Sequence, residues 1–260
     1  MVEVESIFLT TTIIQRLKNN NRIVTATGFF YTKENRIFLV TNKHVIYGNE
    51  FALKESLPEV SQLEIMLHSN RNNLTQNEKV IINLFEGEKK LWLEHLQSDV
   101  DVICIPINLD RQKYFYVTVA DNLINSDNIK IGFEKIFVMG YPLGWYDSVF
   151  NLPITRIGHL SSPFGIPFRG RPFLLGDVET HKGMSGSPVF MYLKDYETKN
   201  QSGTSTINLG SRKFILLGIY SGQPNWPVQD IITNDIRNVP HSLSIVWFSS
   251  LIREIVNIQK

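Results

Sequence analysis

The sequence predicts an all-β fold of the barrel type that ends in one α-helix. Short stretches of strand character recur along the chain, and turn residues separate them. One amphipathic helical pattern stands apart at the C-terminal end. The length of 260 residues and the 43% share of hydrophobic residues suit a single domain, residues 1–260, that buries a sizeable core.

The first half of the chain predicts strands that begin with a hairpin. Residues 23–31 and 36–41 are strand-like, and the polar residues 32–35 between them form the turn. The apolar run within residues 4–18 fits either a helix or a strand. Further strands are expected at 63–67, 79–84, 91–93 and 101–107, the second and third of them as a hairpin.

The second half follows a polar connector at about residues 111–130. Residues 194–211 are polar and predict a loop, whereas the tail at about 246–258 repeats its apolar residues with the helical period. An amphipathic helix docked on the body is therefore expected at the end. The strands expected in this half lie at 136–140, 154–158, 172–175, 189–192 and 214–220.

The charge balance, the single cysteine and the first residues each limit the class of protein. With 26 basic and 25 acidic residues the formal net charge is +1, so we expect neither a nucleic-acid nor a membrane partner. The single cysteine, Cys104, lies in an apolar stretch and is expected to be a buried small hydrophobe. The first residues carry no apolar signal segment, which favours a cytoplasmic protein if the chain is full length.

The hexapeptide 183–188 reads as a nucleophile loop. Ser185 stands between two glycines, and a proline closes the turn. Gly183 can adopt positive φ without steric cost, so consecutive backbone N–H groups can point at one spot beside the serine. Two such N–H groups are what an oxyanion hole requires. The same small residues also occur in ordinary turns, so this loop needs a base and an acid elsewhere in the chain.

His44 and Asp101 are the candidates for that base and that acid. His44 directly follows a predicted strand, and Asp101 opens one. A histidine accepts the serine proton near neutral pH, and a carboxylate fixes its tautomer. A lone histidine at a strand end is more often a half-buried residue bonded to backbone, and Asp99 is a competing acid on the same face as Asp101.

Five segments resemble, in order, blocks of the trypsin-like (chymotrypsin-fold) serine peptidases, in the bacterial disulfide-free branch that includes the HtrA-type proteases. They are residues 41–46 around the histidine, 101–105, 140–144, 183–188 and 218–222. The resemblance implies two antiparallel six-stranded β-barrels with the site between them, followed by a C-terminal helix. The N-terminal barrel would span about residues 20–110, the linker about 111–130 and the C-terminal barrel about 131–245.

The resemblance also assigns roles. Ser185 would be the nucleophile, His44 the general base and acid, and Asp101 the orienting acid. The N–H groups of Gly183 and Ser185 would form the oxyanion hole, and no metal or cofactor is implied. Asp101, and not Asp99, matches the family block, because four mostly apolar residues and a proline follow it.

Substrate recognition is less determined by the sequence. A peptide backbone is expected to pair as an added strand with Ser221, Gly222 and Gln223. Glu179 lies near the place of the family's pocket floor, where an acid favours Lys or Arg, but an exposed loop glutamate fits equally well. Thr180 matches viral 3C-like relatives that select Gln or Glu, yet those relatives carry a histidine at the position of Tyr220, which leaves the preferred residue open.

Met184 marks a departure from the secreted relatives, which carry an aspartate immediately before the nucleophile. That aspartate pairs with a newly cut N-terminus, and this chain has no Ile-Val-Gly-Gly segment. Activation by N-terminal cleavage is therefore not expected. Other contacts must set the loop, and a partner protein is one candidate.

The sequence therefore predicts an intracellular, regulated serine endopeptidase that acts on protein or peptide substrates through an acyl-enzyme. Two alternatives remain at this point. One is an effector protease of a bacterial defence module that a partner activates. The other is a catalytically silent pseudoprotease that uses the same cleft to hold peptides.

Overall fold

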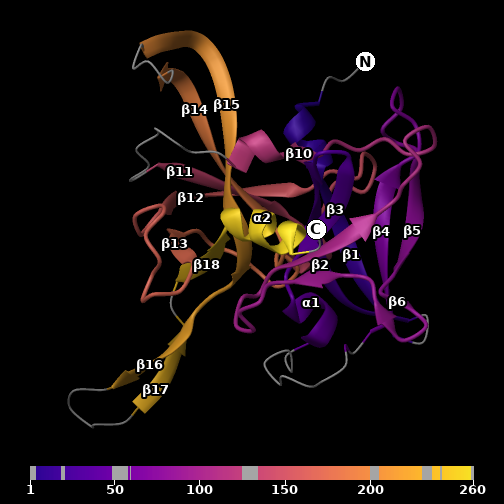
Figure 1. Cartoon of the computed structure of the whole chain (residues 1–260), viewed down its shortest axis with the longest axis horizontal. Helices are drawn as coiled ribbons and strands as arrows, with labels where there is room; N and C mark the ends of the chain where they lie inside the picture. Colours follow the sequence, from indigo (N-terminus) through magenta and orange to yellow (C-terminus); the bar gives the residue numbers. More distant parts are fainter. Residues whose placement is uncertain are drawn as a thin grey trace.

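The computed structural model describes residues 4–18, 21–48, 58, 60–124, 134–199, 205–229, 236–240 and 242–258. Strands dominate both halves, and the all-β, chymotrypsin-like prediction is confirmed. In Figure 1 the strands of the two halves lie on opposite sides of the C-terminal helix α2, Ser250–Asn257. Within the described residues, no helix has the length and apolar character needed to cross a membrane.

The first half forms one eight-stranded sheet in which seven strands follow the order β5-β4-β1-β2-β3-β9-β8, while β10 pairs with β2. A 3₁₀ turn, η1 (Ser6–Thr10), precedes the first strand. A separate short hairpin joins β6 (Phe85–Glu86) to β7 (Lys89–Lys90). The strands of the sheet are β1 Thr11–Lys18, β2 Asn21–Lys33, β3 Arg36–Thr41, β4 Gln62–His68, β5 Asn77–Asn83, β8 Leu93–Glu94, β9 Ile103–Ile107 and β10 Val119–Ala120.

This sheet differs from the expected first barrel in three respects. The described strands form a sheet of eight, where a six-stranded barrel was expected, and it begins at β1, well before residue 20. β1 belongs to it because Ile14 is fully buried between β2 and β4. The predicted hairpin of 79–84 with 91–93 is present only around its turn, where β6 pairs with β7 and the Leu91 N–H donates to the Leu84 carbonyl at 3.0 Å. Its outer strands have other partners: β5 pairs with β4, and β8 pairs with β9. Apolar strands of similar length compete for partners, so the sequence alone did not fix this pairing.

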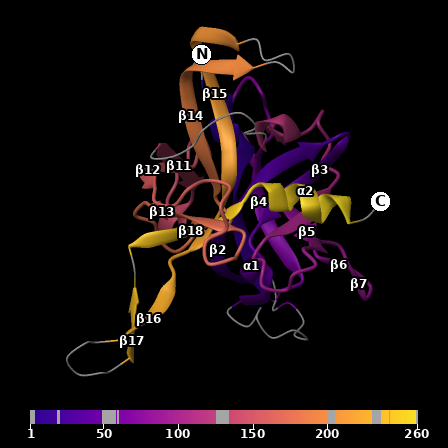
Figure 2. The same cartoon turned by 60° about the vertical axis from the view of Figure 1, so that its left-hand side comes forward.

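The second half closes into a six-stranded barrel, in the order β11-β12-β13-β18-β15-β14. Another 3₁₀ turn, η4 (Pro142–Gly144), follows the first of these strands. A hairpin of β16 (Asn225–Gln229) with β17 (Ile236–Pro240) projects from the barrel (Figure 2). The barrel strands are β11 Lys135–Gly140, β12 Ile154–Leu160, β13 Phe173–Asp177, β14 Pro188–Lys199, β15 Ser205–Gly222 and β18 Leu243–Phe248.

Two expectations for this half need correction. The predicted helix at 246–258 begins only at Ser250, because residues 246–248 pair as β18 with β13 and β15. Valine and aromatic residues at these positions favour a strand, and their spacing fits either period. The predicted loop at 194–211 is wrong for its described residues, which pair as β14, up to Lys199, with β15, from Ser205, since backbone pairing needs no apolar side chains (Figure 2). Residues 200–204 lie outside the described residues.

The expected connector also contains structure. Val119 and Ala120 of β10 pair in parallel with β2, and η3 (Asp121–Ile124) follows directly. Part of the predicted connector, residues 125–130, lies outside the described residues. The described part of the connector therefore docks on the first sheet.

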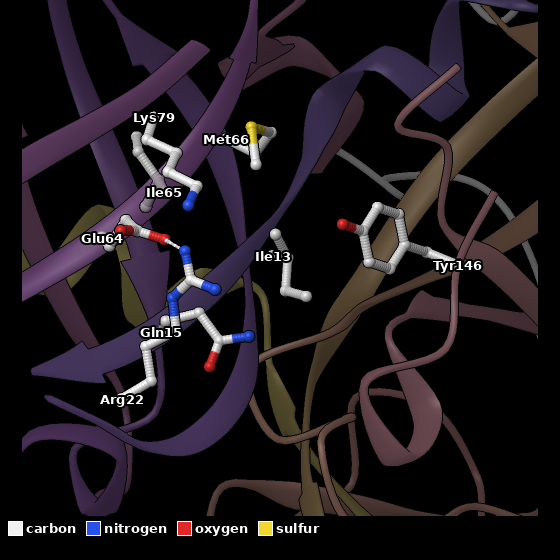
Figure 3. Close-up of a pocket in the computed structure, with 8 residues that line it drawn as sticks. All are labelled: Ile13, Gln15, Arg22, Glu64, Ile65, Met66, Lys79 and Tyr146. Carbon is white, nitrogen blue, oxygen red and sulfur yellow. Dashed lines mark hydrogen bonds and ion pairs between the residues drawn. The ribbon is translucent and has the colours of Figure 1, made fainter. Parts of the chain in front are cut away.

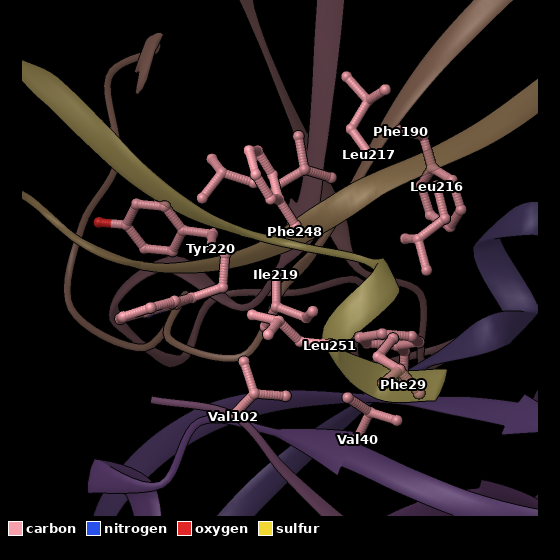
Figure 4. Close-up of a cluster of buried hydrophobic side chains, with 14 of the residues drawn as sticks. Phe29, Val40, Val102, Phe190, Leu216, Leu217, Ile219, Tyr220, Phe248 and Leu251 are labelled. Atoms are coloured by element: carbon pink, nitrogen blue, oxygen red, sulfur yellow. The ribbon is translucent and has the colours of Figure 1, made fainter. Parts of the chain in front are cut away.

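Two hydrophobic clusters fill the molecule, and the first sheet separates them. Phe30 and Leu39 face a cluster within the first half. Their neighbours Phe29 and Val40 face the other cluster, which continues through the second barrel to α2 (Figure 4). Adjacent strand residues point to opposite faces, so β2 and β3 are buried on both sides. This continuous packing holds the two halves in a fixed relation.

Candidate active site

His44 and Asp101 meet because β3 and β9 are neighbours. The pair Thr41↔Ile103 ends the β3–β9 ladder. His44 begins α1 (His44–Tyr47) just beyond β3, and Asp101 precedes β9 by two residues. Strand pairing therefore delivers both side chains to the same end of the sheet.

Asp101 contacts His44 with both carboxylate oxygens. The His44 Nδ1 lies 2.7 Å from Asp101 Oδ2, and the His44 backbone N–H donates to Oδ1 at 2.8 Å. The Asn42 side-chain amide donates to the Asp101 carbonyl at 2.7 Å. Asp101 is buried, whereas the His44 side chain remains 25% exposed. A carboxylate held in this way can keep the proton of imidazole on Nδ1, so that the other ring nitrogen can accept one.

Asp99, the competing acid, lies apart from this pair. Its carboxylate is 57% exposed and lies 3.2 Å from Arg171 Nε. This placement is that of a solvated loop residue.

The serine loop needs glycine at two positions. Gly183 and Gly186 adopt φ values of +96° and +87°. A Cβ at Gly183 would lie 2.3 Å from the Tyr141 carbonyl oxygen, and one at Gly186 would lie 2.1 Å from that of Thr27. These distances exclude any side chain. The loop is thus pressed against β2 and against the end of β11.

Hydrogen bonds from three directions fix this loop. Thr27 of β2 donates its N–H to the Ser185 carbonyl at 2.9 Å and its hydroxyl to the Gly183 carbonyl at 2.8 Å. The Leu143 N–H donates to the Lys182 carbonyl at 2.6 Å, and Gly186 donates to the Tyr220 carbonyl at 2.9 Å.

The N–H groups predicted for the oxyanion hole are not used by these bonds. Those of Gly183 and Ser185 donate to no acceptor in the described part of the chain. Met184, between them, is fully buried in the larger hydrophobic cluster. The loop therefore offers two N–H groups beside the serine hydroxyl, which is the arrangement that stabilises a developing oxyanion.

Ser221 connects the serine loop to the His44–Asp101 pair. The Ser185 hydroxyl lies 3.3 Å from the Ser221 carbonyl oxygen, to which it donates. The Ser221 hydroxyl in turn donates a short hydrogen bond to Asp101 Oδ2. Hydrogen bonds through Ser221 thus link the Ser185 loop of the second half to the His44–Asp101 pair of the first. The hydroxyl of Ser221 was not foreseen, because its partner is 120 residues away in the chain and no spacing signals it.

Glu179 lies on the surface rather than in an enclosed pocket. Its side chain is 73% exposed and lies 2.5 Å from Arg156 Nη2. His181 Nε2 is 3.9 Å from the same carboxylate, and its side chain is 41% exposed. Of the two interpretations of Glu179, this geometry favours the exposed loop residue.

Thr180 and Tyr220 form a buried pair of hydroxyls. Their oxygen atoms are 2.6 Å apart. Burial raises the pKa of the Tyr220 phenol, so it stays neutral. The two uncharged hydroxyls are hydrogen-bonded to each other near the end of β15.

The predicted substrate strand lies at the end of β15. β14 pairs with β15 as far as Pro188 and Ile219, and the edge beyond faces the serine loop. On its other side, Gly222 pairs with Ile245 of β18. Ser221 and Gly222 are half-buried, and Gln223 is exposed.

A separate cavity of about 240 Å³ lies on the first sheet (Figure 3). Two of its charged groups are paired with each other, since Arg22 lies 2.5 Å from Glu64. None of the predicted site residues lines it. The cavity is lined by Ile13, Gln15, Arg22, Glu64, Ile65, Met66, Lys79 and Tyr146.

Comparison with known proteins identifies the class. Residues 26–193 match the family model of the trypsin-like peptidase domain, and the chain belongs to this family. It is a serine endopeptidase by class. No curated protein matches the chain.

A solved structure supports the fold independently. The chain is similar to the crystal structure of the serine endoprotease from Yersinia pestis, with a TM-score of 0.53 and 13% identity. The match covers 99% of this chain and 67% of the Yersinia chain. At this identity the likeness concerns the fold alone.

Proposed function

We propose that this serine endopeptidase uses Ser185 as nucleophile, His44 as general base and acid, and Asp101 as the orienting acid. One observation carries the proposal. Asp101 binds His44 through both carboxylate oxygens. It also accepts a hydrogen bond from the Ser221 hydroxyl, and the Ser221 backbone carbonyl accepts one from the Ser185 hydroxyl. The residues of a triad thus share one hydrogen-bonded cluster.

The reaction follows from these positions. The Ser185 oxygen attacks the substrate carbonyl carbon while His44 takes the hydroxyl proton. The N–H groups of Gly183 and Ser185 receive the oxyanion. When the C–N bond breaks, His44 gives the proton to the leaving amine, and the acyl group stays on Ser185. Water, deprotonated by His44, then attacks the ester, which releases the acid and restores the serine.

Peptide substrates fit this site by strand addition. The open edge of Ser221–Gln223 offers backbone groups to an extended peptide. Arg156 compensates the charge of Glu179, so Glu179 is poorly placed to select a cationic side chain. The neutral hydroxyls of Thr180 and Tyr220 are better candidates for contacts to a polar side chain.

We place this activity inside the cell, in the cytoplasm, on protein or peptide substrates and under regulation. The near-neutral charge of +1 gives no support to nucleic-acid or membrane binding. A regulatory protein partner is the alternative source of control, as in an effector protease of a bacterial defence module. Assaying the purified chain alone, then with co-encoded proteins, separates autonomous from partner-activated cleavage.

A fluorophosphonate probe tests the proposed nucleophile. The wild-type protein is expected to be labelled at Ser185, and Ser185→Ala to abolish labelling. Ser187→Ala is the matched control, because its buried hydroxyl lies two residues away and has no hydrogen-bond partner in the described chain. Ser187→Ala should keep the label. A protein with no label in any form would support the silent pseudoprotease, and a label on another serine would refute the assignment of Ser185.

The physiological substrate can be sought by a proteome-wide comparison of new N-termini. Cells that express the wild-type chain are compared with cells that express Ser185→Ala. Termini found only with the wild type define the cleavage sites, and their flanking residues test the contribution of the Thr180–Tyr220 pair.

A further inference from the structure

Thr27 lies outside every motif that stands out in the sequence. Thr27 is fully buried in β2 of the first half. Its hydroxyl donates to the Gly183 carbonyl at 2.8 Å and accepts from the Tyr141 N–H at 3.2 Å. Its own N–H donates to the Ser185 carbonyl at 2.9 Å. One residue of the first half therefore binds the serine loop at two points.

We infer that Thr27 is a positioning residue that holds the oxyanion hole in its working shape from the first half of the molecule. The inference rests on the proposed function, since it concerns the N–H groups of Gly183 and Ser185. Thr27 acts through the loop backbone and does not touch the reacting atoms. It is therefore distinct from the three proposed catalytic residues.

The geometry of the peptide groups explains the effect. A trans peptide is planar, so its N–H points opposite to its C=O, and fixing one end fixes the other. The peptide between Gly183 and Met184 joins the two proposed donors. Its carbonyl is held by the Thr27 hydroxyl, and its N–H donates to the His181 carbonyl at 3.2 Å. A rotation of this peptide would break both bonds and change the backbone angles that join the two donor-bearing peptides.

The neighbouring peptides are held in the same manner. The Lys182 carbonyl accepts from Leu143, so the Gly183 N–H on the same peptide points the other way. The Met184 carbonyl accepts from the Ser187 N–H at 2.9 Å, which directs the Ser185 N–H. Thr27 supplies the remaining anchor, through a side chain of the first half.

The space around Thr27 suits a hydroxyl. A Cβ at Gly140 would lie 2.8 Å from the Thr27 hydroxyl oxygen, so that glycine leaves room for it. The Thr27 carbonyl accepts from the Thr41 hydroxyl at 2.7 Å, which fixes the backbone of β2 at this point. Met184 carries no charge that could pair with a newly cut N-terminus. The hydrogen bond from the Thr27 hydroxyl to the Gly183 carbonyl is neutral and forms without cleavage of the chain.

The test uses Thr27→Val in the full chain, with Thr27→Ser as the rescue variant. Valine keeps the shape of threonine and the N–H bond to Ser185 but removes the hydroxyl. We expect kcat for a peptide substrate to fall roughly 10- to 100-fold, which is less than the about 10²–10³-fold loss on removing an oxyanion donor outright. KM should change less than kcat. Thr27→Ser should recover most of kcat.

Thr12→Val is the matched control. Thr12 is also buried in a strand, and its hydroxyl also donates to a carbonyl and accepts from an N–H, both of Met66, at 2.8 and 3.2 Å, with a longer contact of 3.3 Å to the Ile13 carbonyl. These bonds join β1 to β4, away from the serine loop. Thr12→Val and Thr27→Val should therefore lower the melting temperature alike. Only Thr27→Val should lower kcat and speed hydrogen exchange in a peptide covering residues 180–187.

The outcomes separate this inference from the proposed function. If the wild-type protein neither cleaves peptides nor reacts at Ser185, the proposed function fails and the inference fails with it. If the wild type is active while Thr27→Val retains its kcat, the inference alone is overturned. It is also overturned if Thr12→Val loses as much kcat as Thr27→Val, because the effect would then be general destabilisation.

Discussion

The two halves of the molecule hold their share of the candidate site by different means. The first half presents His44 and Asp101 from the paired strands β3 and β9, and their mutual contacts lie within that half. The second half presents Ser185 on a loop between strands, bent by two glycines with positive φ. That loop takes two hydrogen bonds from Thr27 of the other half. Strand register builds the acid–base pair, whereas docking of the halves builds the nucleophile loop.

The largest effect is expected from breaking the pair of the first half. Asp101→Asn keeps the shape of the side chain but places an amide donor where one carboxylate oxygen faces His44. The wrong tautomer of imidazole is then favoured, and kcat should fall about 10⁴-fold with the fold intact. Steady-state kinetics and circular dichroism measure the two parts of this prediction.

Asp99→Asn is its control, since Asp99 lies two residues away and is exposed beside Arg171. Its kcat should stay close to that of the wild type. If Asp99→Asn lost more kcat than Asp101→Asn, the assignment of Asp101 as the orienting acid would be wrong.

The next effect comes from breaking the nucleophile loop. In Gly186→Ala the new Cβ would lie 2.1 Å from the Thr27 carbonyl and 2.3 Å from the Thr41 hydroxyl. The loop must shift, so kcat should fall about 10²-fold or more, and unfolding free energy should drop by roughly 2–5 kcal/mol. Activity assays and thermal unfolding measure both.

Gly165→Ala separates backbone strain from this clash. Gly165 also has positive φ, +79°, but nothing lies within 4 Å of its Cβ position. It should lose some stability and little activity. Equal loss of activity in the two variants would contradict the tight contact of the loop with the first half.

A smaller effect is expected at Ser221, one of the residues that join the halves. Ser221→Ala removes the hydroxyl that donates to Asp101 Oδ2. A hydrogen bond to a charged group is worth about 1.5–3 kcal/mol, so a loss of roughly 10-fold in kcat is expected. Fluorophosphonate labelling should slow to a similar extent. An unchanged rate would mean that His44 alone keeps Asp101 in place.

The smallest effect on kcat is expected at Glu94, which binds residues on either side of His44. Glu94 accepts from Lys43, the neighbour of His44, at 2.8 Å, from Tyr47 at 2.7 Å and from Trp92 at 2.6 Å. Burial opposes ionisation of Glu94, but these three donors outweigh it and lower its pKa. Glu94→Gln should cost roughly 1–2 kcal/mol of unfolding free energy at neutral pH, with kcat far less affected than in Asp101→Asn.

The pH dependence of that cost follows from the sign of the shift. A carboxylate with a depressed pKa in the folded state adds stability above its unfolded pKa and loses it as pH falls through the folded value. The difference in melting temperature between wild type and Glu94→Gln should therefore shrink on acidification. A difference that grows at low pH would contradict the role of the ionised Glu94.

The sequence predicted the parts of the fold that local pattern controls. The hairpin of 23–31 with 36–41 is present as β2 and β3, because alternation and a short polar turn determine it together. The pairing of β5 and the start of α2 were missed. In both, residues of the same apolar type fit two arrangements, and contacts with distant strands decide between them.

The residues of the candidate site also fall into those that the sequence predicted and those that it missed. His44, Asp101 and Ser185 stood out because each lies at a strand end in a recognisable motif. Ser221 and Thr27 did not, because their bonds join residues 120 and 156 positions apart. Glu179 was ambiguous for a similar reason: Arg156, its partner, lies on another strand, 23 residues earlier. Such partners become visible only when the strands of the two halves are assembled.

The place of β18 has a consequence for the order of folding. This strand follows the other five strands of the barrel along the chain, yet it lies between β13 and β15 in the closed barrel. Until β18 docks, β15 lacks one of its two neighbours, and Tyr220 and Ser221 have no finished barrel to hold them. A chain in which β18 has not yet docked therefore lacks a finished nucleophile loop, so folding of the barrel precedes activity.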